Sequence, residues 1–151
     1  MRGQVSTELL MIIALILLIF IPLLVLVYVK AGEANQQIGS YQAELTVSRV
    51  ASLANSVGSL GTDTSVITDV YIPPNTVSFE TINTGGGGEI ILRVETNEGP
   101  TEIVDIIRYP ISNPDVIADD ITAGSWIRVR ISSDFDNVNN QAQITIEKMS
   151  A

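Results

Sequence analysis

The sequence lacks two residue types on which many active sites and metal sites depend. Its 151 residues include no cysteine and no histidine. Without cysteine the chain has neither disulfides nor thiolate ligands, and without histidine it lacks the commonest general base and zinc ligand. Because no motif organises the remaining carboxylates into a site, we expect no enzyme activity, no metal and no cofactor.

Positive charge is scarce and unevenly placed. Eight Lys and Arg stand against seventeen Asp and Glu, for a net charge of −9. Residues 1–30 have a net charge of +1 and residues 31–151 a net charge of −10. Phosphate contacts need clustered cations, so we expect no nucleic-acid partner. An acidic second part suits a solvated outer surface.

No charged residue occurs in the 21-residue run from Leu9 to Val29. As a helix this run measures about 30 Å, the thickness of a membrane's hydrocarbon core. A cleaved secretory signal, cut near residues 31–34, normally has an apolar core of only about 7–15 residues. A buried core helix rarely needs such a run, whereas a permanent membrane anchor fits it well.

Glu8 directly precedes the apolar run, where a carboxylate is costly unless it is paired. One interpretation places Glu8 in the lipid headgroup zone or at the helix start. Another gives it a function. The stretch from Arg2 to Glu8 resembles the class III signal peptide of euryarchaeal type IV pilins, whose pattern is Gln-x-Ser-x-Glu-x-x-x-Leu. Gln4, Ser6 and Glu8 match this pattern, and Ile12 stands at the Leu position.

The resemblance implies processing by a membrane prepilin peptidase, which would cut between Gly3 and Gln4 and remove the leader, residues 1–3. It also implies that Gln4, Ser6 and Glu8 set the register of assembly, with the Glu8 carboxylate facing the new amine of a neighbouring copy. Cyclisation of Gln4 to pyroglutamate would leave Glu8 to find backbone donors instead. The implied partners are the membrane before assembly, the pilus assembly machinery and further copies of the chain.

After leaving the membrane, the apolar segment of residues 4–30 needs a new apolar environment, which bundling with other copies supplies. We expect Pro22 to kink this helix. The expected polymerisation core consists of Leu9, Leu10, Ile13, Leu17, Phe20, Leu24 and Val27.

Residues 31–60 predict an amphipathic helix that continues the first and ends near residues 58–61. A break into two helices near Gly32 is the alternative. The apolar stripe expected to pack on the following domain contains Ile38, Tyr41, Leu45, Val47, Val50, Ala54 and Val57.

Residues 61–151 predict a β-rich head, a small sandwich or twisted sheet, and the fold class is α+β. Gly85–Gly88 suits a hairpin connection, and Asp134–Asn139 suits a turn better than a calcium loop. The expected strands cover residues 66–72, 77–82, 89–95, 102–108, 125–132 and 141–148.

Together these features predict a subunit of an extracellular archaeal type IV pilus that first inserts in the membrane and then self-assembles, with adhesion as the family's commonest role. Two alternatives stay open. One is a membrane-anchored β-domain at the cell surface that never polymerises. The other is a subunit of an archaellin-like motility filament.

Overall fold

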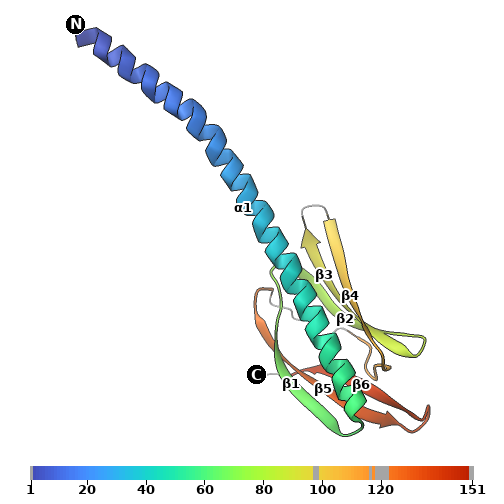
Figure 1. The fold of residues 1–151 in the computed structure, drawn as a ribbon. Helices are drawn as coiled ribbons and strands as arrows, with labels where there is room; N and C mark the ends of the chain where they lie inside the picture. The colour runs from blue at the N-terminus through green and yellow to red at the C-terminus, as the bar shows by residue number, and fades with distance from the viewer. Residues whose placement is uncertain (1, 97–98, 116, 118–122, 150–151) are drawn as a thin grey trace. The chain divides into compact units, whose positions relative to one another are not determined.

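The computed structural model describes residues 2–96, 99–115, 117 and 123–149, with side chains from Ser6 onward. The chain divides into an N-terminal unit, Met1–Gln37, and a head unit, Ile38–Ala151. One long helix is followed by two antiparallel three-stranded sheets (Figure 1). This α+β architecture confirms the predicted fold class.

Helix α1 spans Arg2–Leu60, and its helical conformation continues through both Pro22 and Gly32. The alternative of two separate helices is therefore wrong. Pro22 is tolerated because it removes only one backbone hydrogen bond from a helix of 59 residues. The helix ends where Gly61 takes a φ of 101°, a left-handed conformation that glycine adopts without a Cβ penalty.

All six predicted strands form, each close to its expected position. Strands β1, β5 and β6 make the first sheet in the order β1-β5-β6, and β2, β3 and β4 make the second in that order. Gly85 and Gly86, both at positive φ, form the hairpin connection between β2 and β3, which is shorter than the predicted Gly85–Gly88 because Gly87 and Gly88 belong to β3. The bounds are β1 Thr64–Tyr71, β2 Thr76–Thr84, β3 Gly87–Thr96, β4 Gly99–Ile107, β5 Trp126–Asp136 and β6 Gln141–Lys148.

One hydrophobic core joins the last part of α1 to both sheets. Strand side chains such as Phe79, Ile90, Leu92 and Ile131 are fully buried in it. The helix contributes mostly small residues, because small side chains let its backbone approach the strands closely. The buried helix residues are Ala43, Val47, Val50, Ala51, Ala54 and Val57.

The predicted stripe is therefore only partly correct. Ile38, Tyr41 and Leu45 are exposed, at 53%, 65% and 71% of their surface. At about 100° per residue, Leu45 lies some 200° around the helix from Val47, so the two cannot share a face. The packed face is the one that contains Ala43 and Val47.

Residues 110–115, which belong to the connection between β4 and β5, run along an open edge of each sheet. On one sheet edge the Ile144 N–H donates to the Pro110 carbonyl and the Ser112 N–H donates to the Ile144 carbonyl, both at 2.8 Å. On the other edge the Thr81 N–H donates to the Asp115 carbonyl at 3.0 Å. The segment thus pairs with β6 of one sheet and with β2 of the other, which satisfies edge groups that would otherwise invite other strands.

Candidate assembly surface

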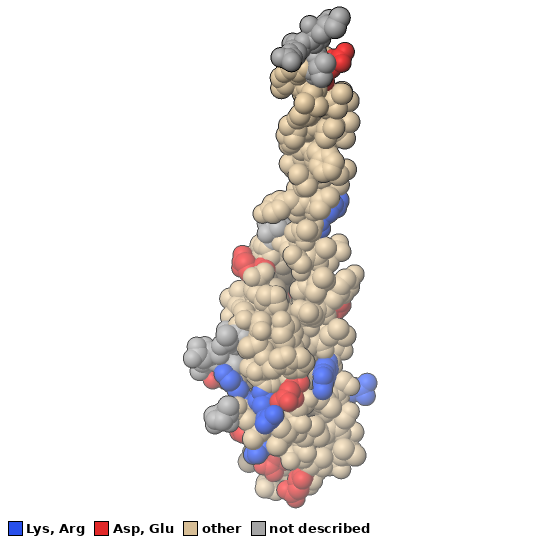
Figure 2. Space-filling view, turned by 90° about the vertical axis from the view of Figure 1, so that its left-hand side faces the viewer, with Lys and Arg blue, Asp and Glu red and all other residues tan. Residues whose placement is uncertain are grey.

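The N-terminal unit exposes an apolar surface that none of the described residues covers. Every large hydrophobic side chain from Leu9 to Val29 is at least 46% exposed. Figure 2 shows an unbroken stretch of uncharged surface along this part of α1, whereas charged residues gather on the head unit. A helix that is apolar all round is normally buried or membrane-spanning, so this surface calls for a cover from outside the chain.

The seven residues predicted as the polymerisation core lie on one face of α1. Their positions follow spacings of three, four and seven residues, which keep side chains within about 100° of one another. Their exposed fractions range from 46% for Ile13 to 63% for Leu10. The structure thus places these residues together and leaves them accessible to a partner.

Length and composition make α1 able to cross a membrane. The described part, Ser6–Leu60, contains an 18-residue window of mean hydropathy 3.5, and none of that window is buried inside the protein. It is the one helix of this kind among the described residues. Such a helix near the N-terminus is compatible with an anchor or a signal sequence.

The residues of the signal-like motif lie in the first turns of α1. Ser6 and Glu8 are exposed, and among the described residues Glu8 forms no salt bridge. Gly3 and Gln4 belong to the helical backbone, but the side chain of Gln4 lies outside the described part. A helical carboxylate next to an uncovered apolar surface is available to a cation from another chain.

A polar boundary follows the apolar run. The Lys30 ammonium donates to a Glu33 carboxylate oxygen at 2.7 Å, and both side chains are more than half exposed. An exposed pair of this kind contributes little stability. Its charges nevertheless prefer water, so they mark the end of the surface that suits lipid.

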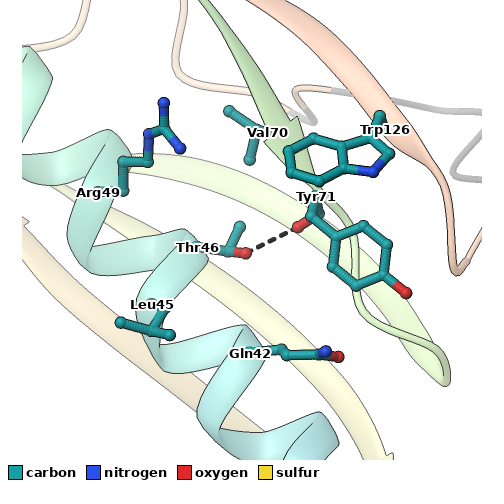
Figure 3. A pocket seen from close by; sticks show the side chains of 7 residues that line it. All are labelled: Gln42, Leu45, Thr46, Arg49, Val70, Tyr71 and Trp126. Atoms are coloured by element: carbon teal, nitrogen blue, oxygen red, sulfur yellow. Dashed lines mark hydrogen bonds between the residues drawn. The ribbon is translucent and has the colours of Figure 1, made fainter.

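The head unit carries a groove beside the exposed side of α1 (Figure 3). It encloses about 180 Å³. The Thr46 hydroxyl donates to the Tyr71 carbonyl at 2.7 Å, which holds the helix against the end of β1. The lining residues are Gln42, Leu45, Thr46, Arg49, Val70, Tyr71 and Trp126.

Two aromatic side chains form one wall of the groove. The rings of Tyr71 and Trp126 lie 5.3 Å apart between centroids and are tilted by 54°, and Trp126 is 66% exposed. The sequence alone does not predict this groove. The alternation of apolar and polar residues along β5 does indicate an exposed tryptophan, since it places Trp126 on the same strand face as the exposed Arg128 and Arg130.

Exposed ion pairs dominate the electrostatics of the sheets. Arg128 pairs with Asp69, with Nε and Oδ1 2.9 Å apart, and this hydrogen bond lowers the pKa of Asp69 and raises that of Arg128. Arg93 pairs with Glu102, and their hydrogen bond raises the pKa of Arg93. Both pairs are solvated, so they orient side chains more than they stabilise the fold.

The turn predicted for Asp134–Asn139 is only partly correct, because Asp134–Asp136 belong to β5 and residues 137–140 form the turn that joins β5 to β6. Its central carboxylate is already engaged, because Asp136 accepts hydrogen bonds from the Val138 N–H at 2.8 Å and the Asn139 side-chain amide at 2.6 Å. These bonds, the one from Asn139 foremost, lower the pKa of Asp136. In the described part of the chain, no three Asp or Glu side chains gather where they could hold a metal ion.

Comparison with protein-family models, with curated proteins and with solved structures finds no match to this chain. The features that bear on its function are the exposed apolar helix, the motif before it and the surfaces of the head unit.

Proposed function

We propose that this protein is a pilin-like structural subunit that inserts in a membrane and then assembles into an extracellular filament through α1. The observation that carries the proposal is the uncovered apolar surface of Leu9–Val29, which follows directly on the motif of Gln4, Ser6 and Glu8. That the helix is long and apolar enough to enter a membrane follows from its length and hydropathy alone.

The proposed assembly replaces one apolar environment with another. Burying a Leu, Ile or Phe side chain completely is worth about 1.5–3 kcal/mol, and much of this surface is still exposed in the isolated chain. In a membrane, lipid supplies the cover. In a filament, the helices of other copies supply it, so the same residues serve both states.

Glu8 gives this assembly its register in the proposal. Placed in an apolar filament interior without a cation, its carboxylate would lose several kcal/mol of solvation. A neighbouring amine, freed at Gln4 by cleavage after Gly3, would offset that loss at one axial position only. The pair therefore selects among alignments more than it adds stability.

The intact mass and N-terminal sequence of the protein from its native host test the processing step. We expect a chain that begins at Gln4, free or as pyroglutamate, in filaments visible by electron microscopy. A chain that begins at Met1 and forms no filaments would indicate a plain membrane anchor, and one that begins within residues 31–35 would indicate ordinary secretion.

Glu8→Ala and Glu8→Gln test the register role of the carboxylate independently of the processing step. Both variants should enter the membrane but give few or irregular filaments, because neither retains the carboxylate. Thr7→Ala, one position before Glu8, serves as the matched control and should assemble. Regular filaments from both Glu8 variants would show that the carboxylate does not set the register.

A further inference from the structure

The groove lined by Leu45, Tyr71 and Trp126 has the composition of a protein-binding site. Trp, Tyr and Arg are the residues most enriched among those that dominate binding energies, and this groove contains one of each, with Arg49 as the cation. Its volume of about 180 Å³ is smaller than the roughly 300–1,000 Å³ of pockets for drug-sized ligands. It suits a single apolar side chain offered by another protein surface.

The turn between β5 and β6 offers such a side chain. Val138 is 91% exposed, more than any other exposed large hydrophobic residue of the described chain. The bonds from the Val138 N–H and the Asn139 amide to the Asp136 carboxylate hold the turn in shape. Because a preorganised turn loses little conformational freedom on docking, Val138 is well placed to act as an insert.

Groove and turn lie at opposite ends of one strand. Strand β5 begins at Trp126 and ends at Asp136, ten residue steps that span roughly 33 Å at about 3.3 Å each. One copy therefore cannot place its own Val138 in its own groove. A contact between these two different surfaces on successive copies is heterologous, and such a contact leaves both ends free for further growth.

The charges of the two surfaces are complementary. Asp134 and Asp136 lie at the end of β5, just before the turn, whereas Arg49 lines the groove. The Arg49 guanidinium donates to the Thr68 hydroxyl at 3.1 Å, and among the described residues it forms no salt bridge. Attraction between the acidic end of β5 and this cation would orient the two copies and raise the rate at which they meet.

We propose that the Val138 turn of one copy docks in the Leu45–Tyr71–Trp126 groove of the next copy, and that this head-to-tail contact links the head units along the filament. The contact rests on the proposed function, because the filament is the assembly that brings successive copies together. It adds a second, independent surface to the one formed by the apolar helices.

Disulfide trapping tests the contact in the full-length chain. The natural sequence has no cysteine, so a Leu45→Cys, Val138→Cys double variant contains only the two introduced thiols. Under mild oxidation its filaments should yield a ladder of covalently joined copies on a non-reducing gel, since a disulfide forms only when the two Cα atoms approach within about 7 Å. The matched control is Leu45→Cys, Val104→Cys, because Val104 is also exposed but lies on β4 of the other sheet.

The outcomes separate the contact from the filament itself. A ladder from the Leu45–Val138 pair alone supports the contact. Wild-type filaments together with no ladder, or with equal ladders from both pairs, overturn the contact and leave the proposed function standing. If another class of partner fills the groove, the Leu45–Val138 pair also stays uncrosslinked in intact filaments. Absence of wild-type filaments refutes the proposed function instead.

Val138→Asp provides a second measurement that needs no thiol chemistry. The substitution puts a charge into the apolar groove, and it should raise the critical concentration for assembly about tenfold or more, as expected for a central interface residue. Val104→Asp should leave the critical concentration unchanged. Both sites are exposed in the single chain, so neither variant should lose its fold. Wild-type assembly by Val138→Asp would overturn the contact.

Discussion

Shortening leucines on the exposed face of α1 should weaken assembly by an amount that their exposure predicts. Leu10, Leu17 and Leu24 are 63%, 50% and 58% exposed in the single chain. Replacing a leucine with alanine removes three carbon groups, worth roughly 2.4 kcal/mol of burial at about 0.8 kcal/mol each. Assembly can bury only the fraction of each side chain that is still exposed in the single chain. The expected loss of assembly free energy is therefore about 1.5 kcal/mol for Leu10, about 1.2 kcal/mol for Leu17 and about 1.4 kcal/mol for Leu24.

These contributions should add, because residues seven apart along a helix are about 10 Å apart and do not contact one another. The triple alanine variant therefore loses about 4 kcal/mol per copy, which corresponds to a critical concentration roughly 1,000-fold higher. Leu17→Ala alone should raise the critical concentration about sevenfold. Cavities left in the filament would increase both values.

The critical concentration must be measured in detergent-free buffer, because a micelle would cover the same side chains in the dissociated subunit. Leu60→Ala is the matched control, since Leu60 is 71% exposed but belongs to the head unit. It should assemble as the wild type does. Thermal unfolding of the head should be unchanged in all variants. If the triple variant keeps an intact head and its critical concentration rises by only about threefold over wild type, the reasoning is contradicted. The burial estimate requires a far larger rise.

Three further predictions concern the head unit. Gly58→Ala should destabilise it by about 1–3 kcal/mol in thermal unfolding, because a Cβ there would overlap the Tyr109 ring, whereas Gly32→Ala, where a Cβ meets nothing, should not. Asn83→Ala should also destabilise it by about 1–3 kcal/mol, since Asn83 exchanges two 2.7 Å hydrogen bonds with the backbone of Ile111; Asn137→Ala is the control, and equal unfolding temperatures would refute this role. In an NMR titration Asp136 should show a pKa below 3.8 that rises in Asn139→Ala. Because folding lowers this pKa, the stabilisation is present above the ordinary value and is lost as the pH falls through the folded value; an unchanged pKa in the variant would contradict this.

Local chemistry explains why the elements of the fold were predictable. Val, Ile and Thr mark each strand, and Gly, Pro, Asn or Asp bounds it, so all six strands lie close to their expected ranges. The strand boundaries extend past the prediction at β3, which begins at Gly87 and not at Glu89. There a side chain on Gly88 would overlap Ile111, so glycine is required by packing where strand propensity argues against it.

Long-range pairing explains what the sequence could not predict. Nothing in β1 identifies β5 as its neighbour, or assigns β2, β3 and β4 to a separate sheet. The predicted helix stripe joined residues from two opposite faces of α1, and periodicity alone does not show which of those two faces meets the strands. Ala43 and Ala51 pack against the sheets, whereas the larger Tyr41 and Leu45 stay exposed. The groove depends on both facts, and so it emerged only from the structure.

The surface pattern of α1 separates folding from assembly. From Ala43 to Val57 one face of the helix is buried in the head's own core, whereas from Leu9 to Val29 the helix is apolar on every side and contributes nothing to that core. The polar stretch between them, which includes the Lys30–Glu33 pair, divides the two regions. Because the head's core involves none of the residues from Leu9 to Val29, these residues can exchange lipid for other copies without unfolding the head. In the proposed filament, each copy would therefore leave the membrane already folded, and only its apolar segment would change environment.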